Sequence, residues 1–144
     1  MTLNIKPATL SDFETVYHFI CELEEVSFDK EKMRVIFEEN LKSQKIIYLI
    51  GSYQNEPAAF LSCHLQNLLH HNGMIAEIQE LFILKKFRRK KFGSILIDYL
   101  IALLKKKKVF QLEVTSNKVR TETLHFYKSI GFTDSHIKFV KPLI

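Results

Sequence analysis

The stretch "ELFILKKFRRKKFGSILIDYL", Glu80–Leu100, combines three patterns that together decide the fold. It begins as an apolar run and continues into residues 85–91, where six of seven side chains are Lys or Arg. It ends in a segment whose apolar residues recur at helical spacing. A strand, a loop and a helix in this order form an anion site, because the first helical turn presents unpaired N–H groups and the positive end of its dipole. The stretch therefore predicts a site that holds a phosphate group.

The basic residues are concentrated in two runs, residues 85–91 and Lys105–Lys108. Without these ten side chains, the chain's 21 basic residues fall to eleven against 16 acidic ones, so the remainder is acidic although the whole carries +5. A nucleic-acid-binding domain spreads its positive charge over a face and interleaves it with exposed aromatic residues. The distribution favours a small polyanion and argues against nucleic acid.

Outside Glu80–Leu100, apolar periodicity predicts the order β-α-α-β-β-β-α-β-α-β. The expected strands span residues 3–9, 46–53, 58–66, 74–84, 109–116 and 132–143. The expected helices span residues 13–26, 30–41, 92–104 and 120–130. Ser11 or Asp12 can cap the first helix, and Gly131 can end the last one. The pattern is an α/β (α+β) fold with about six strands and four helices.

The 144 residues have the length of one domain, and we expect residues 1–144 to form it. Cys21 and Cys63 are too few and too far apart in sequence to predict a disulfide framework or a zinc site. The N-terminus lacks the apolar core of a signal peptide, and no run reaches the length of a membrane span. We expect a cytoplasmic protein without membrane contact.

The basic loop resembles the acetyl-CoA loop of the GCN5-related N-acetyltransferases (GNAT), whose signature is Q/R-x-x-G-x-G/A. Here it reads Arg88-Arg89-Lys90-Lys91-Phe92-Gly93, with Lys91 in place of the first glycine. The segment "LEVTSNKVRTETLHFYKSIGF", residues 112–132, is similar to the fifth strand and fourth helix of that family. The resemblance implies a mixed, mostly antiparallel central sheet flanked by four helices, with acetyl-CoA as cosubstrate.

A narrower resemblance is to the bacterial aminoalkylphosphonate N-acetyltransferases. It rests on "VYHFICELEEVSFDKEKMRVIFEENL" (residues 16–41), "HLQNLLHHNGMIAEIQEL" (residues 64–81) and "SHIKFVKPL" (residues 135–143). It implies acetyl transfer to the primary amine of a small aminophosphonate. Another amine (a polyamine, an aminoglycoside or a protein amine) and a CoA-binding protein without catalysis remain alternatives.

The resemblance assigns the cofactor contacts to the end of the fourth strand, the loop, and the fifth strand. The expected CoA-binding residues are Leu81, Phe82, Ile83, Arg88, Arg89, Lys90, Lys91, Phe92, Gly93, Ser94, Asn117 and Tyr127. Backbone amides of the loop hold the pyrophosphate in that family, and the amide of Phe82 or Ile83 polarises the acetyl carbonyl. Asn117 is otherwise an ordinary turn former at a strand end.

Two carboxylates, Glu77 and Glu80, are candidates for the base that deprotonates the amine. Strict alternation puts Glu77, Gln79 and Leu81 on one face of the strand, and Glu80 on the other. A carboxylate next to a sheet covered on both faces is either desolvated or open to a cleft, and both situations suit a general base. By resemblance Glu77 is the first choice and Glu80 the second.

Tyr127, in "FYKSIGF", matches the family tyrosine that protonates the departing thiolate. The alternative is that Phe126 and Tyr127 are core aromatics. Because a thiol has a pKa near 8.5, it leaves fairly well unaided, so the loss of this hydroxyl costs less than the loss of a base.

The acceptor contacts expected from the sequence are polar and cationic. They are His64, His70, His71, Gln79 and Arg120. An imidazolium, or a divalent ion bound by imidazole and oxygen, would supply positive charge for a phosphonate, and a guanidinium matches phosphonate geometry. The sequence does not decide whether a metal is bound. It also leaves open a homodimer, which GNAT proteins often form through their C-terminal strands.

Overall fold

The structure, a computed structural model, describes residues 2–144, which form five strands, four α-helices and three short 3-10 helices. The strands are β1 (Asn4–Pro7), β2 (Ile46–Tyr53), β3 (Glu56–Leu68), β4 (Gly73–Ile83) and β5 (Gln111–Val114). The α-helices are α1 (Phe13–Glu24), α2 (Lys30–Leu41), α3 (Phe92–Lys106) and α4 (Thr121–Ser129). The 3-10 helices are η1 (Leu10–Asp12), η2 (Leu69–His71) and η3 (Lys85–Phe87).

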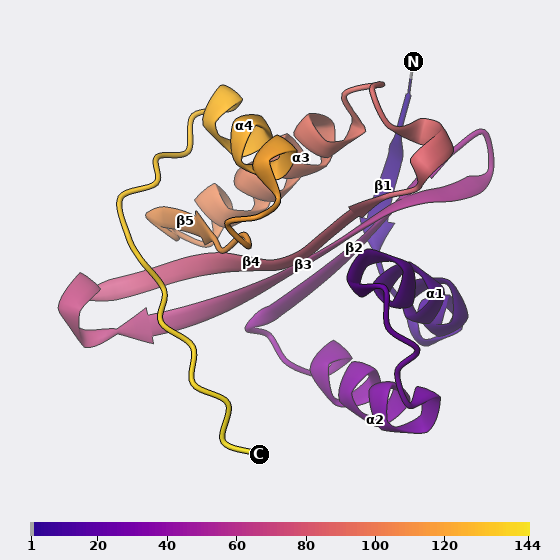
Figure 1. Ribbon diagram of the computed structural model, residues 1–144, viewed down its shortest axis with the longest axis horizontal. Helices are drawn as coiled ribbons and strands as arrows, with labels where there is room; N and C mark the ends of the chain where they lie inside the picture. Colours follow the sequence, from indigo (N-terminus) through magenta and orange to yellow (C-terminus); the bar gives the residue numbers. More distant parts are fainter. Residues whose placement is uncertain (1) are drawn as a thin grey trace.

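The five strands form one sheet in the order β1-β2-β3-β4-β5 (Figure 1). Neighbours from β1 to β4 are antiparallel, and β5 is parallel to β4. The strands β2 and β3 form a hairpin joined by Gln54 and Asn55, whose φ angles of 51° and 63° fit a two-residue turn that matches strand twist. The mixed, mostly antiparallel sheet expected from the resemblance is confirmed.

Helices cover both faces of the sheet (Figure 1). On one face α1 and α2 pack on the sheet, with Phe19 of α1 in the same buried cluster as Phe60 of β3 and Phe82 of β4. On the other face α3 and α4 pack on side chains such as Leu61 and Ile78. The expected apolar stripes of these helices are therefore the parts that face the sheet.

Of the residues predicted to cap helices, one has this role in the structure and one does not. Gly131 has φ of 100° just after α4, so it ends that helix in the left-handed region as expected. Asp12 precedes α1, but its carboxylate accepts the N–H of Thr9 at 2.8 Å and the ammonium of Lys6 at 2.7 Å instead of capping α1. It stabilises the turn that leads into the helix.

The expected sixth strand at residues 132–143 is wrong. Residues 132–144 form neither helix nor strand, and they run as an extended trace from α4 to the C-terminus (Figure 1). Alternating apolar residues are compatible with a strand, but a strand also requires a neighbour with free backbone groups. Within residues 2–144, β5 is an edge strand that pairs only with β4, but residues 132–144 form no hydrogen-bonded ladder with its free side.

Candidate active site

A β-bulge in β4 determines which side chains reach the site. Ser62 of β3 lies opposite Glu80, but the next residue, Cys63, lies opposite Ile78, so Gln79 is the extra residue. Cross-strand partners share a face, and Ser62 and His64, opposite Glu80 and Glu77 respectively, are two residues apart on β3. The bulge therefore puts both carboxylates on the same face, which corrects the alternation expected from the sequence.

β4 and β5 separate at the bulge. Their parallel pairing extends from Ile75 opposite Gln111 to Ile78 opposite Val114 and ends there. A cavity of about 240 Å³ opens beyond this point. It is lined by Leu23, Glu24, Ile78, Gln79, Glu80, Leu81, Val114, Thr115, Ser116, Asn117, Arg120, Thr123 and Tyr127. We call it the β4–β5 cavity.

The backbone of β4 presents unpaired amides to this side. The N–H of Leu84 donates to the carbonyl of Ala58 at 2.8 Å, so it points toward β3. Because N–H directions alternate along a strand, those of Leu81 and Ile83 point the opposite way, toward the β5 side. Phe82 differs: its N–H points toward β3, and its ring packs 4.9 Å from that of Phe19 in the core.

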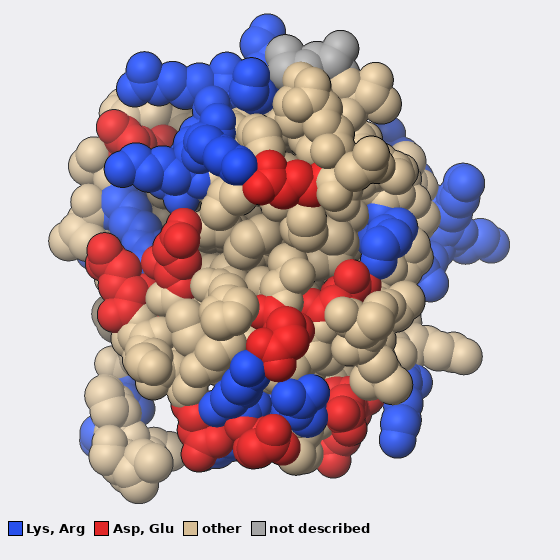
Figure 2. Space-filling model, turned by 90° about the vertical axis from the view of Figure 1, so that its right-hand side faces the viewer, with Lys and Arg blue, Asp and Glu red and all other residues tan. Residues whose placement is uncertain are grey.

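The basic loop leads into the first turn of α3. The N–H groups of Phe92, Gly93 and Ser94 precede the first i→i−4 bond, which Ile95 donates to the Lys91 carbonyl at 3.1 Å. No side chain caps this turn among the described residues. Figure 2 shows Lys and Arg side chains gathered toward the upper left, at the height of this loop in Figure 1, while acidic side chains dominate the lower half.

Two positions of the loop adopt left-handed backbone. Arg89 has φ of 66° and Lys91 has φ of 64°. Lys91 thus takes, without a glycine, the conformation for which glycine is the preferred residue. A Cβ at Gly93 would lie 3.2 Å from the edge of the Phe126 ring, so the small size of this residue lets α3 and α4 approach closely.

Several basic side chains of the loop already have partners. The guanidinium of Arg88 donates from Nε to the Ile83 carbonyl at 2.8 Å. Lys86 pairs with Glu56 at 2.7 Å. Lys90 lies 5.9 Å above the centre of the Tyr53 ring. These contacts anchor the loop to β3 and β4, and they hold part of its positive charge in a fixed position.

Tyr127 and Ser116 supply polar atoms to the β4–β5 cavity. Tyr127 is buried between Phe126 and Phe132, and burial raises the pKa of its hydroxyl to about 12. The hydroxyl therefore keeps its proton at neutral pH. Ser116 Oγ is buried and has no hydrogen-bond partner within residues 2–144. A buried orphan of this kind is costly, and a ligand in the cavity can satisfy it.

Asn117 and Arg120 line the same cavity from the segment before α4. The Asn117 side chain accepts the N–H of Val119 at 3.0 Å, so it is also the turn former that the sequence suggested. Arg120 lies at the N-cap of α4, with one terminal nitrogen 3.8 Å from Glu24 of α1.

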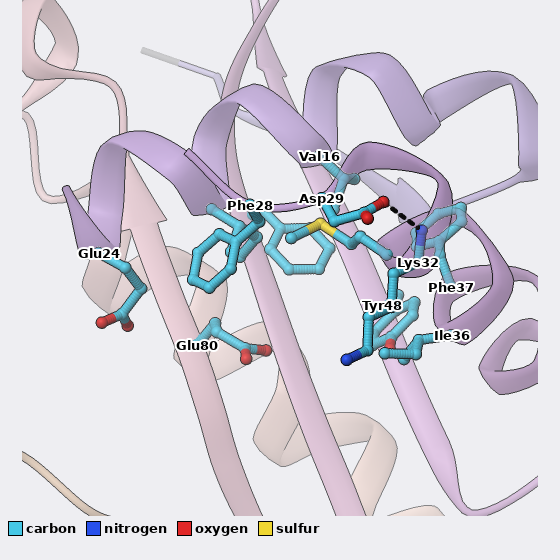
Figure 3. A pocket seen from close by; sticks show the side chains of 12 residues that line it. Val16, Glu24, Phe28, Asp29, Lys32, Ile36, Phe37, Tyr48 and Glu80 are labelled. Carbon is cyan, nitrogen blue, oxygen red and sulfur yellow. Dashed lines mark hydrogen bonds between the residues drawn. The ribbon is translucent and has the colours of Figure 1, made fainter. Parts of the chain in front are cut away.

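A second cavity, of about 500 Å³, lies between α1, α2 and the sheet (Figure 3). We call it the α1–α2 cavity. Its lining consists of Val16, Ile20, Glu24, Phe28, Asp29, Lys32, Met33, Ile36, Phe37, Tyr48, Phe60 and Glu80. Figure 3 shows Glu80 pointing into it from the sheet, with Glu24 at its edge. These two carboxylates line both cavities, so the two spaces meet beside Glu80.

Glu80 is held by a residue that sequence reasoning missed. Ser62 is fully buried; its hydroxyl donates to the Glu80 carboxylate, and its oxygen accepts the Glu80 N–H at 2.9 Å. The one signal in the sequence is a single hydroxyl inside the apolar run "AAFLSC". Glu24, Lys32, Tyr48 and Ser116 were also missed, because their positions depend on how separate elements pack.

Glu77 has a different environment. It lines neither cavity, and its carboxylate accepts the hydroxyl of Thr115 at 2.9 Å. Its cross-strand neighbours are His64 on β3 and Glu113 on β5. Glu77 is therefore part of a row of polar residues across the sheet. The bulge at Gln79 lies between it and Glu80, beside which the cavities meet.

The three histidines expected to contact the acceptor, His64, His70 and His71, line neither cavity. His70 and His71 lie in η2, at the tip of the β3–β4 hairpin, which extends away from α1 and α3 (Figure 1). Their rings are 4.3 Å apart, and His71 lies 3.9 Å from Glu113. The 3-10 turn thus brings together the rings of two adjacent residues, which an extended segment would point in opposite directions.

No group of three or more His, Cys, Asp or Glu side chains within residues 2–144 has an arrangement that could hold a metal ion. The divalent metal considered from the sequence is thus not supported. In the same range, no helix has both the length and the apolar character needed to cross a bilayer.

The family model described as "Acetyltransferase (GNAT) family" matches residues 13–132. The chain therefore belongs to the GNAT family and is an N-acetyltransferase, as the resemblance implied. Acetyl-CoA is the cosubstrate of this family.

Individual relatives add detail. The aminoalkylphosphonate N-acetyltransferase of Salmonella typhimurium (strain LT2) is 32% identical over 139 residues, covering 96% of this chain and 90% of that protein. A solved structure described as a transcriptional regulator from Bacillus halodurans has a TM-score of 0.89 at 22% identity, covering 99% of this chain and all of that one. An aminoglycoside 6′-N-acetyltransferase from Acinetobacter baumannii has a TM-score of 0.86 at 14% identity, covering 99% of both chains. The two structures support the fold alone.

Proposed function

We propose that this protein transfers the acetyl group of acetyl-CoA directly to the primary amine of a small molecule, an aminoalkylphosphonate. The observation that carries the proposal is the position of Glu80. It lies where the β4–β5 cavity meets the α1–α2 cavity, so one carboxylate can face an acetyl donor in the first and an amine in the second. Direct transfer needs the two reactants side by side in this way.

The chain's own residues fit a CoA thioester. The N–H groups that open α3, from Phe92 to Ser94, would hold the anionic phosphates at the positive end of the helix dipole, and the basic loop would add charge. The outward amides of Leu81 and Ile83 would bond the extended arm and the acetyl oxygen. The orphan hydroxyl of Ser116 and the side-chain NH2 of Asn117, whose oxygen already accepts the Val119 N–H, would complete the cavity. Acetyl-CoA supplies an activated acetyl group.

Three groups of the chain have roles in the transfer. The Glu80 carboxylate accepts a proton from the substrate ammonium, because an amine attacks only when it is neutral. Ser62, which lies opposite Glu80 next to the bulge, orients that carboxylate by hydrogen bonding. The Tyr127 hydroxyl, which burial keeps protonated with a pKa of about 12, donates its proton toward the departing sulfur.

The choice of a phosphonate rests on the Salmonella relative and on two cations. Lys32 lines the α1–α2 cavity, and Arg120 lines the β4–β5 cavity. A guanidinium and an ammonium can both neutralise a phosphonate, the guanidinium with paired donors. The carboxylates of Glu24 and Glu80 favour instead a polycationic acceptor such as a polyamine or an aminoglycoside, which is the second candidate.

A turnover assay tests the proposal. The protein is incubated with acetyl-CoA and, separately, with aminomethylphosphonate, spermidine and an aminoglycoside, and both CoA release and the acetylated product are measured. We expect acetylated aminomethylphosphonate, with a larger kcat/KM than for the polycations. A larger kcat/KM for spermidine would reverse the substrate choice. CoA binding without turnover of any amine would indicate a non-catalytic CoA-binding protein.

A further inference from the structure

The α1–α2 cavity is much larger and more apolar than a minimal aminophosphonate requires. Its volume is about 500 Å³, whereas a cavity of roughly 150 Å³ accommodates benzene. Eight of the twelve lining residues are apolar or aromatic. They are Val16, Ile20, Phe28, Met33, Ile36, Phe37, Tyr48 and Phe60. An acceptor with one carbon between its amine and its phosphonate would leave most of this surface without a partner.

The polar groups of the cavity are few, and part of them is already used. The Asp29 carboxylate caps α2 by accepting the Lys32 N–H at 3.0 Å. Glu24 lies 3.8 Å from Arg120. Glu80 remains as the carboxylate that points into the space from the sheet (Figure 3). An amine bound at Glu80 therefore has Lys32 as a partner for its phosphonate, and its other substituents are directed among apolar side chains.

Tyr48 provides one oriented donor in the apolar wall. Its hydroxyl accepts the side-chain N–H of Asn40 at 2.7 Å, which leaves its own proton for another acceptor. Burial, together with the nearby charge of Glu80, raises the pKa of Tyr48, so the hydroxyl stays neutral. A site with apolar walls and a few placed polar groups is typical of a pocket that selects for the shape of an apolar group.

Resting on the acetyl transfer proposed above, we infer that the acceptor amine carries an aromatic or branched alkyl group that fills the α1–α2 cavity, as in a 1-aminoalkylphosphonate with an apolar substituent. The amine lies at Glu80, and the substituent lies against Phe28, Met33 and Ile36. Burying such a group in an apolar pocket raises kcat/KM by at least about tenfold over the unsubstituted amine.

A series of three acceptors tests the inference. The protein is assayed with acetyl-CoA and aminomethylphosphonate, 1-aminoethylphosphonate or 1-amino-2-phenylethylphosphonate, with mass detection of the product. We expect kcat/KM to rise along the series, by about tenfold or more from first to last. A constant or falling kcat/KM overturns the inference, while turnover of aminomethylphosphonate leaves the proposed function standing. Lack of turnover with all three, and with phenylethylamine, overturns the proposed function itself.

Two neighbouring positions on α2 provide a matched pair of variants. Ile36 and Val35 are 51% and 55% exposed, but only Ile36 lines the cavity. Ile36→Asn puts an amide into the apolar wall, so the preference for the phenyl compound over aminomethylphosphonate falls several-fold. Val35→Asn leaves that ratio as in the wild type. Equal ratios in both variants and the wild type contradict the inference, and thermal unfolding checks that both variants are folded.

Discussion

Glu77 and Glu80 are separated by two residues in sequence but have different environments in the folded chain. Glu80 lines both cavities and is held by Ser62, whereas Glu77 bonds Thr115 outside them. Resemblance alone put Glu77 first, and the geometry puts Glu80 first. We therefore expect Glu80→Gln to lower kcat/KM by about 10²- to 10⁴-fold, the usual contribution of a general base. Steady-state kinetics with acetyl-CoA and aminomethylphosphonate measure it.

The matched control for this prediction is Glu77→Gln, which removes the same charge from the same face of β4. It should change kcat/KM by no more than a few-fold. A loss in Glu77→Gln as large as in Glu80→Gln would return the base to Glu77. Chemical denaturation of both variants separates a catalytic loss from a loss of folded protein.

Tyr127 gives a prediction about pH. Because burial raises its pKa from 10.0 to about 12, the folded state favours the neutral phenol, and this contribution to stability is present below pH 10. It is lost as pH rises from 10 through about 12, since the unfolded chain ionises first. The difference in unfolding free energy between wild type and Tyr127→Phe should therefore shrink over that range. Denaturation at several pH values measures it, and a constant difference contradicts it.

The same variant tests the catalytic role of the hydroxyl. Tyr127→Phe should lower kcat by less than Glu80→Gln does, because a thiolate leaves without full protonation. In the wild type, ionisation of Tyr127 should cause no fall in kcat below about pH 11, given its raised pKa. Full turnover of Tyr127→Phe at every pH would mean that the ring serves packing alone.

At the scale of elements, the loop before α3 combines a functional conformation with residues that do not favour it. Lys91 has φ of 64°, and a side chain in this region costs about 1 kcal/mol. Lys91→Gly should raise the free energy of unfolding by up to that amount and leave CoA affinity equal or higher. Chemical denaturation and calorimetric titration with CoA measure the two effects.

Lys90→Gly is the control for the loop, because it removes the same charge at a position that does not have positive φ. It should lower stability by about 0.5–1 kcal/mol through the extra flexibility of glycine. If both glycine variants change stability equally, the left-handed conformation of Lys91 has no energetic consequence.

At the scale of the whole molecule, the C-terminal residues 135–144 pair with no strand in the part of the chain that the structure describes. Ile137, Phe139, Val140 and Leu143 are 69%, 90%, 78% and 90% exposed. Apolar side chains exposed together are typical of an interaction surface. We propose that the segment pairs with a second copy of the chain. A chain ending at Asp134 should then be monomeric and the full chain dimeric in light scattering after size exclusion.

Asp134 is kept in that truncation because it pairs with Lys128 of α4 at 3.1 Å, and Phe132 is kept because its ring packs on Tyr127. Phe139→Asp in the full chain is a milder test and should also weaken the dimer. A monomeric full-length protein at micromolar concentration would exclude the proposal.

Local patterns were sufficient wherever a residue's own neighbours in sequence determine its structure. The apolar stripe of α3 and the glycine after α4 depend on contacts a few residues away, and both agree with prediction. The basic run before a helix likewise indicated an anion site, because the unpaired N–H groups belong to the helix itself. The sequence by itself therefore determined the order of elements, apart from the last strand, and the family.

The tertiary structure alone decided how the site is arranged. The bulge at Gln79 arises from the two-against-one pairing of β4 with β3, and it moves Glu77 onto the face of Glu80 against strict alternation. The two cavities form because the pairing of β5 with β4 ends at the bulge and because α1, α2 and the sheet leave a space between them. Residues far apart in the chain, such as Ser62 and Glu80 or Glu24 and Arg120, meet only through this packing. Sequence periodicity carries no information about such contacts, since they depend on the register and spacing of whole elements.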